Sequence, residues 1–329
     1  MTPASSFRKR LNYYRRIFGA YLTPTKSQLT FWHERPGMSE FTPGELGAYY
    51  MTFAQKADYE GTYDANGIPM LDYLGVIGPQ HNPIAIAQYG LGNFNQWMST
   101  QDPERRHKFL RVADWLVANL EENPGGFRVW NHHFDFEYRT PLRAPWYSGL
   151  AQGQGISVLV RAHKITRQGN YLNAARAAFR CMRAHVDVGG VIFSDEQGHR
   201  WIEEYIVSPP THILNGFLWA LWGVYDLALL TDDQAVWRVW NESLETLRTN
   251  LHLYDTGYWS LYEQSGTRMK MMASPFYHQL HIVQLQVTAK LTGEAIFQEY
   301  ADRWAGYMQS RVNRGRALVY KSVFKLCYY

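Results

Sequence analysis

The sequence predicts a mainly α-helical protein, an (α/α) toroid of about four helix pairs with a small N-terminal arm and a β-hairpin. A proline recurs at intervals of 66, 64 and 66 residues, and a strongly apolar stretch follows each one. An amphipathic stretch comes next in every unit. A helix that is apolar nearly all round is buried, whereas an amphipathic helix covers it from outside. A period of this length is typical of a repeated supersecondary unit.

The expected inner helices start soon after these four prolines, and an expected outer helix follows each of them. The prolines are Pro79, Pro145, Pro209 and Pro275; the inner stretches are 84–91, 149–162, 213–230 and 280–291; the outer stretches are 102–120, 170–186, 232–251 and 294–312. In the first outer helix Asp102 can cap, and Pro103 suits the first helical position. Because similarity between the units is faint, an ordinary all-α protein whose helices alternate by chance is the alternative.

Three regions follow from this pattern: 1–77, 78–312 and 313–329. The first contains basic residues interleaved with apolar ones between Arg8 and Phe18, which predicts a short amphipathic helix. Such a helix docks on the body or contacts a membrane surface or partner. The turn signal at 64–67, Asp-Ala-Asn-Gly, predicts the hairpin. We expect the toroid in 78–312 and a basic, aromatic tail in 313–329.

Composition limits the classes of function. The chain has 329 residues, of which 46% are hydrophobic, enough for a large core. Its net charge of +4 is mild, and it has no phosphate-binding loop or nucleic-acid motif. Two cysteines exclude a disulfide framework and favour a reducing, cytoplasmic location. No uninterrupted apolar run is long enough to span a membrane.

Aromatic residues make up 16% of the chain. Aromatic rings stack on sugars while tyrosine and tryptophan donate hydrogen bonds, so this content suits a polysaccharide groove; the alternative is that the rings form core. Tyr147, Tyr205 and Tyr277 lie at or just before the starts of apolar stretches. We expect them at one end of a single cavity.

Several motifs resemble the heparosan glucuronyl 5-epimerase family. They are NPIAIAQYGL at 82–91, WYSGLAQGQ at 146–154, EEY at 203–205 with LNGF at 214–217, YHQLHI at 277–282, and the pairs at 303–304 and 310–311. The resemblance runs in unbroken order from about 78 to 312. Compared with the animal enzymes, the chain resembles a compact bacterial form without their β-rich insertion and membrane anchor.

The resemblance implies an isomerase that converts D-glucuronate to L-iduronate within a heparosan-like chain, without a metal or other cofactor, and that pairs as a homodimer. The expected partner is therefore an anionic, uronate-containing polysaccharide, not nucleic acid. The carbon 5 proton lies next to a carboxylate, so its removal creates an enolate-like dianion. Inversion then needs one group to take this proton and another to deliver a proton to the opposite face.

By resemblance, Tyr277 and Glu204 are the opposed acid and base, with Tyr205 and Tyr262 assisting. The order of the two faces stays open at this point. Tyrosine starts near pKa 10, so a phenolate base would need nearby cations or hydrogen-bond donors.

Nine further residues are candidates for substrate binding: Gln88, Tyr89, Tyr147, Gln152, Asn215, Arg268, His278, His281 and Arg311. Packing is the alternative for Tyr147, and satisfied buried amides are the alternative for Gln88, Gln152 and Asn215. The histidine spacing offers too few ligands for a metal, which favours hydrogen bonding or a substrate role. Arg161 and Arg311 pair either with uronate or with internal carboxylates. Animal relatives carry an arginine soon after the tyrosine matching Tyr262; here Arg268 or Lys270 is the possible substitute.

Other functions remain open. A uronate lyase would abstract the same proton but expel the oxygen on carbon 4. A glycoside hydrolase needs two carboxylates flanking the bond, an arrangement that the adjacent Glu203 and Glu204 do not favour. A binding protein without catalysis is the third alternative, against which the intact tyrosines argue. Fold alone does not decide among them.

Overall fold

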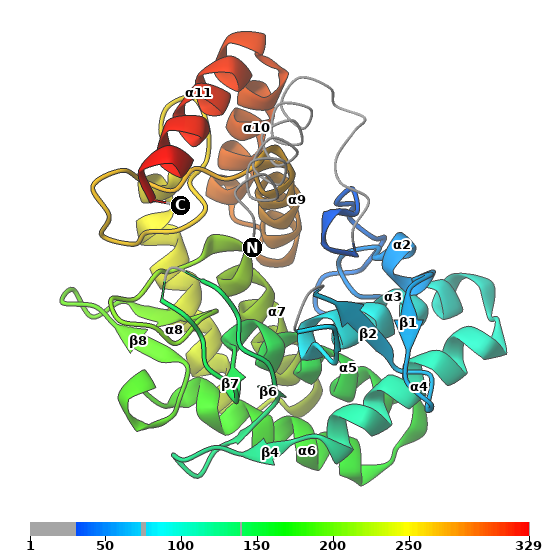
Figure 1. Ribbon diagram of the computed structural model, residues 1–329. Coiled ribbons are helices and arrows are strands. Elements are labelled where there is room, and N and C mark those ends of the chain that lie inside the picture. The colour runs from blue at the N-terminus through cyan, green and yellow to red at the C-terminus, as the bar shows by residue number, and fades with distance from the viewer. Residues whose placement is uncertain (1–30, 74–76, 139, 329) are drawn as a thin grey trace, which may run out of the picture.

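The computed structural model describes residues 31–73, 77–138 and 140–328. Its main body confirms the predicted mainly α toroid (Figure 1). The inner helices are α3 (Pro83–Thr100), α5 (Gly149–Thr166), α7 (Leu214–Thr231) and α9 (Pro275–Thr292); the outer helices are α4 (Pro103–Ala118), α6 (Gly169–Phe179), α8 (Gln234–Asn250) and α10 (Ala295–Gln309). Neighbouring inner helices pack on one another, and each outer helix packs on the inner helix before it.

All four inner helices end in the same way. Gln101, Arg167, Asp232 and Gly293 follow their last residues with φ between 49° and 73°, and each donates its backbone N–H to the last turn. This left-handed cap stops a helix and reverses the chain. The next residue then precedes an outer helix, and Asp102 and Asp233 cap theirs with a side-chain oxygen. The predicted repeat is therefore a repeated helical hairpin.

Close helix packing depends on small residues where α5 crosses α7. A Cβ at Gly153 would lie 2.4 Å from the Ala220 Cα, and one at Gly223 would lie 2.1 Å from the Gly153 carbonyl oxygen. By length and composition α7 is the one helix among the described residues that could cross a membrane. However, 83% of that window is buried inside the fold, as in the core helix of a toroid.

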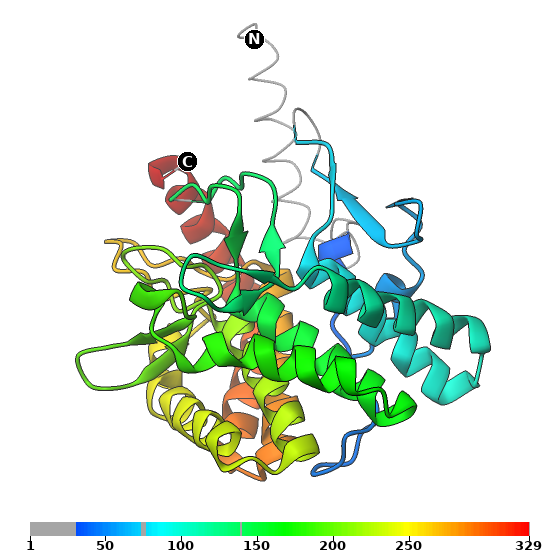
Figure 2. The same ribbon diagram turned by 90° about the horizontal axis from the view of Figure 1, so that it is seen from below.

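Short antiparallel strands precede the first helical pair and connect later ones. They form the sheets β1 (Thr62–Tyr63), β2 (Pro69–Asp72), β3 (Pro79–Gln80); β4 (Glu121–Glu122), β5 (Arg128–Val129); β6 (Asn131–His132), β7 (Trp146–Tyr147); and β8 (Ile192–Ser194), β9 (Arg200–Ile202). The β1–β2 pair is the predicted hairpin, and its turn is closed by hydrogen bonds from Asn66 and Ile68 to the Asp64 carboxylate. The β1–β2 and β6–β7 pairs lie on one side of the helices (Figure 2).

The arm described here, residues 31–61, closes the ring between the first and last inner helices (Figure 1). It contains the 3-10 helix η1 (Phe31–His33) and the short helix α2 (Ala54–Ala57). Asn95 of α3 bonds the Tyr49 and Met51 backbone, and Lys290 of α9 lies 4.4 Å from the Phe41 ring centre. The arm is therefore part of the core.

A buried ion pair joins the arm to α5 and α7. Arg161 contacts Asp226 at 2.6 Å, and its Nε donates to the Gly47 carbonyl. Tyr50 donates to the other oxygen of Asp226 at 2.6 Å. Arg161 therefore pairs with an internal carboxylate, the second of the two alternatives that the sequence left open for it.

Some helix boundaries were predicted wrongly. The helix expected over 170–186 ends at Phe179 and is followed by the 3-10 turns η2 (Arg180–Arg183) and η3 (Val186–Val188). It ends there because the backbone N–H groups of Val191 and Ile192 donate hydrogen bonds to the Cys181 and Ala184 carbonyls. The helix expected over 294–312 ends at Gln309, since Ser310 caps a new helix, α11 (Arg311–Tyr328). Another 3-10 turn, η4 (Leu251–Tyr254), follows α8. The basic helix expected near Arg8 lies outside the described residues.

Candidate functional site

The N-terminal ends of α5, α7 and α9 lie at one end of the ring, together with the segments that lead into them. Gly149 at the start of α5 donates its N–H to the Glu203 carbonyl, and Leu214 at the start of α7 donates to the Tyr262 carbonyl. Ser274 caps α9 by accepting from the Tyr277 N–H. The first two of these bonds join segments that are far apart in sequence.

Four predicted catalytic residues meet there. Glu204 lies against the first turn of α7, where the Asn215 amide is 3.5 Å from its Oε2. The Tyr262 and Tyr277 ring centres are 4.8 Å apart with an angle of 64° between the rings, and Tyr205 packs in the same apolar cluster. Glu204 and Tyr262 are buried, whereas Tyr205 and Tyr277 are partly exposed. We call these four residues the tyrosine–glutamate cluster.

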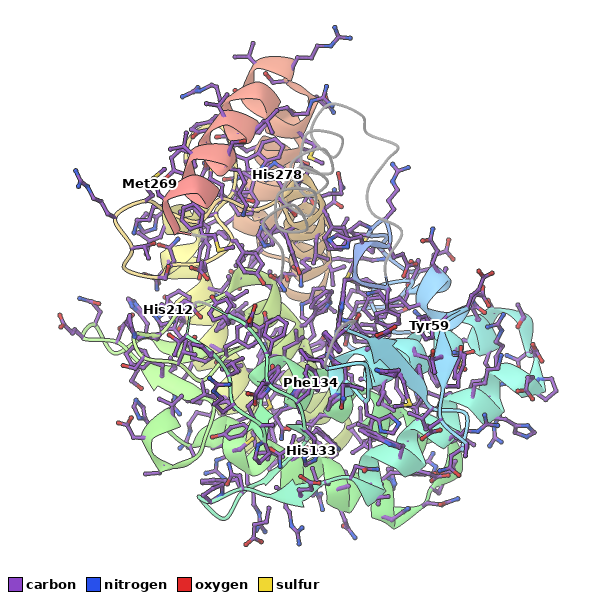
Figure 3. The ribbon with its side chains drawn as sticks, viewed as in Figure 1. Tyr59, His133, Phe134, His212, Met269 and His278 are labelled. Atoms are coloured by element: carbon purple, nitrogen blue, oxygen red, sulfur yellow. The ribbon has the colours of Figure 1, made fainter. Side chains whose placement is uncertain are left out.

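Figure 3 labels one residue on each of three segments around the cluster: Phe134 on the β6–β7 hairpin, His212 on the loop before α7, and His278 on α9. Phe134 belongs to a small apolar group that also includes Trp146 and touches Tyr205. His278 is the next residue after Tyr277, so the helix that holds the phenol also holds a buried imidazole.

The Glu204 carboxyl has an unusual affinity for its proton. Burial raises its pKa to about 8, opposed by a hydrogen bond with Tyr205 and reinforced by the negative charges of Glu263 and Glu203. In the described part of the chain no lysine or arginine pairs with Glu204. A carboxyl that titrates close to neutral pH can exchange protons in either direction, as a general acid or base requires.

The pKa values of the tyrosines are raised, whereas a phenolate base would need a lowered pKa. Burial raises the pKa of Tyr277, and the Glu204 charge raises it further, while a hydrogen bond with Tyr262 works against both. Burial and the Glu204 charge also raise the pKa values of Tyr205 and Tyr262. These phenols are consequently neutral proton donors in the resting protein.

The neighbouring carboxylate, Glu203, has a different environment. It accepts hydrogen bonds from the backbone N–H of Thr211 and His212 and contacts the His212 imidazole. The His212 ring in turn stacks on Trp201 at 4.4 Å. Glu203 therefore holds the loop before α7, while Glu204 faces the tyrosines.

Four of the predicted substrate-binding residues have structural partners. Gln152 accepts from the Trp130 N–H and donates to the Ala178 carbonyl, Gln88 bonds Lys56 and Gln154, and Tyr89 packs on Tyr63. The Tyr147 hydroxyl donates to the Gly190 carbonyl at 3.3 Å. The structure joins these residues to the core or to hairpins.

The remaining candidates fall into two groups. His278 and His281 are buried around the Ser260 hydroxyl at 2.7 and 3.0 Å, and burial lowers the pKa of His278 to about 3, so its imidazole is neutral. Arg268 and Arg311 are exposed, and neither contacts the tyrosine–glutamate cluster within the described residues. The backbone N–H of Lys270 donates to the Tyr320 hydroxyl of α11.

Two residues at the site did not appear among the predicted ones. Glu263 is fully buried beside Tyr262, and Tyr138 donates its hydroxyl to Glu263 Oε2. Glu263 is adjacent to a predicted catalytic residue and could have been found from that signal. Tyr138 is 125 residues away from its partner and carries no local pattern that indicates the contact.

A buried lysine lies beside a hollow elsewhere in the protein. Arm residues Glu34, Phe53 and Lys56 line this hollow together with Trp219 and Phe276. Burial lowers the pKa of Lys56 to about 7, and its ammonium donates to Gln88 at 2.7 Å.

No group of three or more potential metal ligands occurs in the described ranges.

Comparison with known proteins identifies related sequences. Residues 125–306 match the family model "D-glucuronyl C5-epimerase C-terminus". D-glucuronyl C5-epimerase of Caenorhabditis elegans is 32% identical over 227 residues, which are 64% of this chain and 36% of that protein. The chain thus spans about a third of this relative. An uncharacterised protein of Methanocaldococcus jannaschii is 29% identical over 69% of this chain and 78% of its own length.

Solved structures share the fold at low sequence identity. A cellobiose 2-epimerase from Spirochaeta thermophila matches with a TM-score of 0.51 and 12% identity, covering 89% of this chain and 84% of its own. A D-mannose isomerase matches with a TM-score of 0.52 and 8% identity, covering 77% of this chain and 68% of its own. These similarities support the toroid fold.

Proposed function

Because the chain belongs to the D-glucuronyl C5-epimerase family, we propose that it inverts carbon 5 of D-glucuronate residues to give L-iduronate within a heparosan-like polysaccharide. The observation that carries this proposal is the buried Glu204 next to the Tyr262–Tyr277 pair. Glu204, Tyr262 and Tyr277 all lie inside the region that the family model matches.

In the proposed reaction the Glu204 carboxylate takes the proton from carbon 5. The electron pair of that C–H bond moves into the uronate carboxyl group, and the Tyr277 hydroxyl delivers a proton to the opposite face. Glu204 ends protonated and Tyr277 ends as phenolate. Their hydrogen bonds with Tyr205 and Tyr262 offer a route for returning these protons.

The pKa values support this assignment of roles. With Glu204 near 8 and Tyr277 higher, the resting pair is a carboxylate and a neutral phenol at alkaline pH. The dipole of α7 adds positive potential at the end where Glu204 lies, which favours negative charge there. We therefore expect kcat/KM to rise with pH through about 8, as Glu204 loses its proton.

The decisive experiment incubates the full chain with heparosan in deuterated water and follows carbon 5 by NMR, with absorbance monitored for unsaturated uronate. Deuterium at carbon 5 together with iduronate signals is the expected result. Rising absorbance with chain cleavage would instead identify a lyase. No change with any uronate polymer would leave a binding role and contradict the proposed epimerase.

Substitution of Gly216 tests the position of Glu204. A Cβ on Gly216 would lie 2.1 Å from Glu204 Oε2 and 2.7 Å from Glu204 Cβ, so Gly216→Ala must displace that side chain. Because a displacement of about 1 Å can cost about a hundredfold in rate, we expect a loss of that order in deuterium exchange. Gly306→Ala is the matched control, since a Cβ there meets nothing within 4 Å. Equal exchange in both variants would argue against Glu204 as base.

A further inference from the structure

The described residues between β6 and β7, 133–138 and 140–145, form one wall of the tyrosine–glutamate cluster. Phe136 and Leu142 pair across it, and Phe134, Leu142 and Trp146 form its buried apolar side. Trp146 contacts Tyr205, with ring centres 5.8 Å apart. The loop thus leans on a residue adjacent to Glu204.

Tyr138 extends from this loop to the opposite side of the cluster. Its ring centre is 4.8 Å from that of Tyr205, and its hydroxyl donates to Glu263 Oε2. Tyr138 also packs with the apolar group of Ile213, Tyr262 and Ala273. One side chain therefore connects the β6–β7 loop with the segment that carries Tyr262.

Glu263 is fully buried and receives two hydroxyl groups. Ser265 donates to Oε1 at 2.6 Å, while Tyr138 occupies Oε2. Burying a carboxylate without hydrogen-bond donors costs folding free energy. Donors also fix the position of the carboxylate and therefore of its negative charge. Replacing Tyr138 by phenylalanine removes one of these donors but keeps the ring.

We propose that Tyr138 is a positioning residue of this site, which holds the Glu263 carboxylate next to Glu204 and so controls when Glu204 can act as base. This inference rests on the proposed function for its catalytic meaning. Tyr138 acts through Glu263 and needs no contact with the substrate.

The electrostatic reason is repulsion between like charges. Glu204 is flanked by the carboxylates of Glu203 and Glu263, and a nearby negative charge favours its protonated form. The phenols that also border this space include Tyr73, Tyr138, Tyr205, Tyr254, Tyr262 and Tyr277. The His212 imidazole also borders this group and contacts Glu203. Without the Tyr138 hydroxyl, the Glu263 carboxylate is no longer held beside Glu204. Glu204 should then lose its proton at a lower pH.

The test compares Tyr138→Phe, Glu263→Gln and the wild type in pH profiles of kcat/KM for deuterium exchange at carbon 5. We expect the alkaline rise to move to lower pH in both variants, by roughly half a pH unit or more. Tyr171→Phe is the matched control, because its hydroxyl donates to the Asp114 carboxylate at 2.6 Å on the outer helices. The control profile should not move.

A second measurement separates this inference from the proposed function. The pH dependence of thermal unfolding reports the ionisation of Glu204 without any substrate. The pH midpoint of this dependence should be lower in the same two variants than in the wild type. If the wild type exchanges no proton but these midpoints fall, the epimerase proposal fails and the role of Tyr138 stands. An unmoved midpoint in Tyr138→Phe overturns the inference, whether or not Glu263→Gln moves.

Discussion

Deuterium exchange at carbon 5 is expected to fall by roughly a hundred- to ten-thousandfold in the Tyr277→Phe variant, the range that loss of a positioned acid or base costs. The phenylalanine ring keeps the 4.8 Å contact with Tyr262 but has no proton to deliver to the second face. Because Tyr277 is partly exposed, loss of its hydroxyl should leave the fold intact. NMR of the polymer in deuterated water measures the exchange.

Tyr307→Phe provides the control for this prediction. Tyr307 lies on the outer helix α10, and its hydroxyl is 3.5 Å from Asp255, away from the cluster. We expect wild-type exchange in that variant. Normal exchange in Tyr277→Phe would remove Tyr277 from the mechanism and leave Tyr205 or Tyr262 as the proton donor.

Glu204→Gln is expected to stabilise the fold at alkaline pH while it stops exchange. The pKa of Glu204 is about 8 in the folded chain and 4.5 as an ordinary glutamate, so the folded protein retains a proton that the unfolded chain releases between these values. The stability that the folded protein gains from the neutral Glu204 carboxyl is fully present below pH 4.5 and is lost as pH rises through 8. At about 1.4 kcal/mol per pH unit, the loss is on the order of 3 to 5 kcal/mol. Glutamine has no proton to lose and should avoid it.

Denaturant unfolding at pH 5, 7 and 9 measures this difference as a change in the free energy of unfolding. The wild type should lose stability relative to Glu204→Gln as the pH rises, with the largest gap at pH 9. Glu299→Gln, at an exposed position on α10, should follow the wild type. Parallel stability curves for the wild type and Glu204→Gln would mean that Glu204 is not buried as a neutral acid.

Predictions from sequence succeeded where the signal was local or periodic. The inner helices were recognised because each is apolar nearly all round, and the β1–β2 hairpin because its turn residues are diagnostic. Boundaries failed where a competing hydrogen bond ended a helix, as Ser310 does by capping α11. The domain division, the homodimer and the cytoplasmic location stay predictions.

The candidate site was predictable in part. The family motifs carried Glu204, Tyr205, Tyr262 and Tyr277, and the structure brings these four together. The motifs did not indicate the direction of the tyrosine pKa shifts, which depends on nearby carboxylates. Their roles in catalysis stay predictions until the variants are measured.

By itself the sequence determined the fold class, the family and the four residues of the cluster, because helical periodicity and short motifs are written in neighbouring residues. Only the tertiary structure decided that Glu204 is buried beside two other glutamates, that Arg161 serves Asp226, and that Tyr138 reaches Glu263. Burial and charge act through space between segments distant in the chain, so the proton affinity of Glu204 is a property of the folded ring.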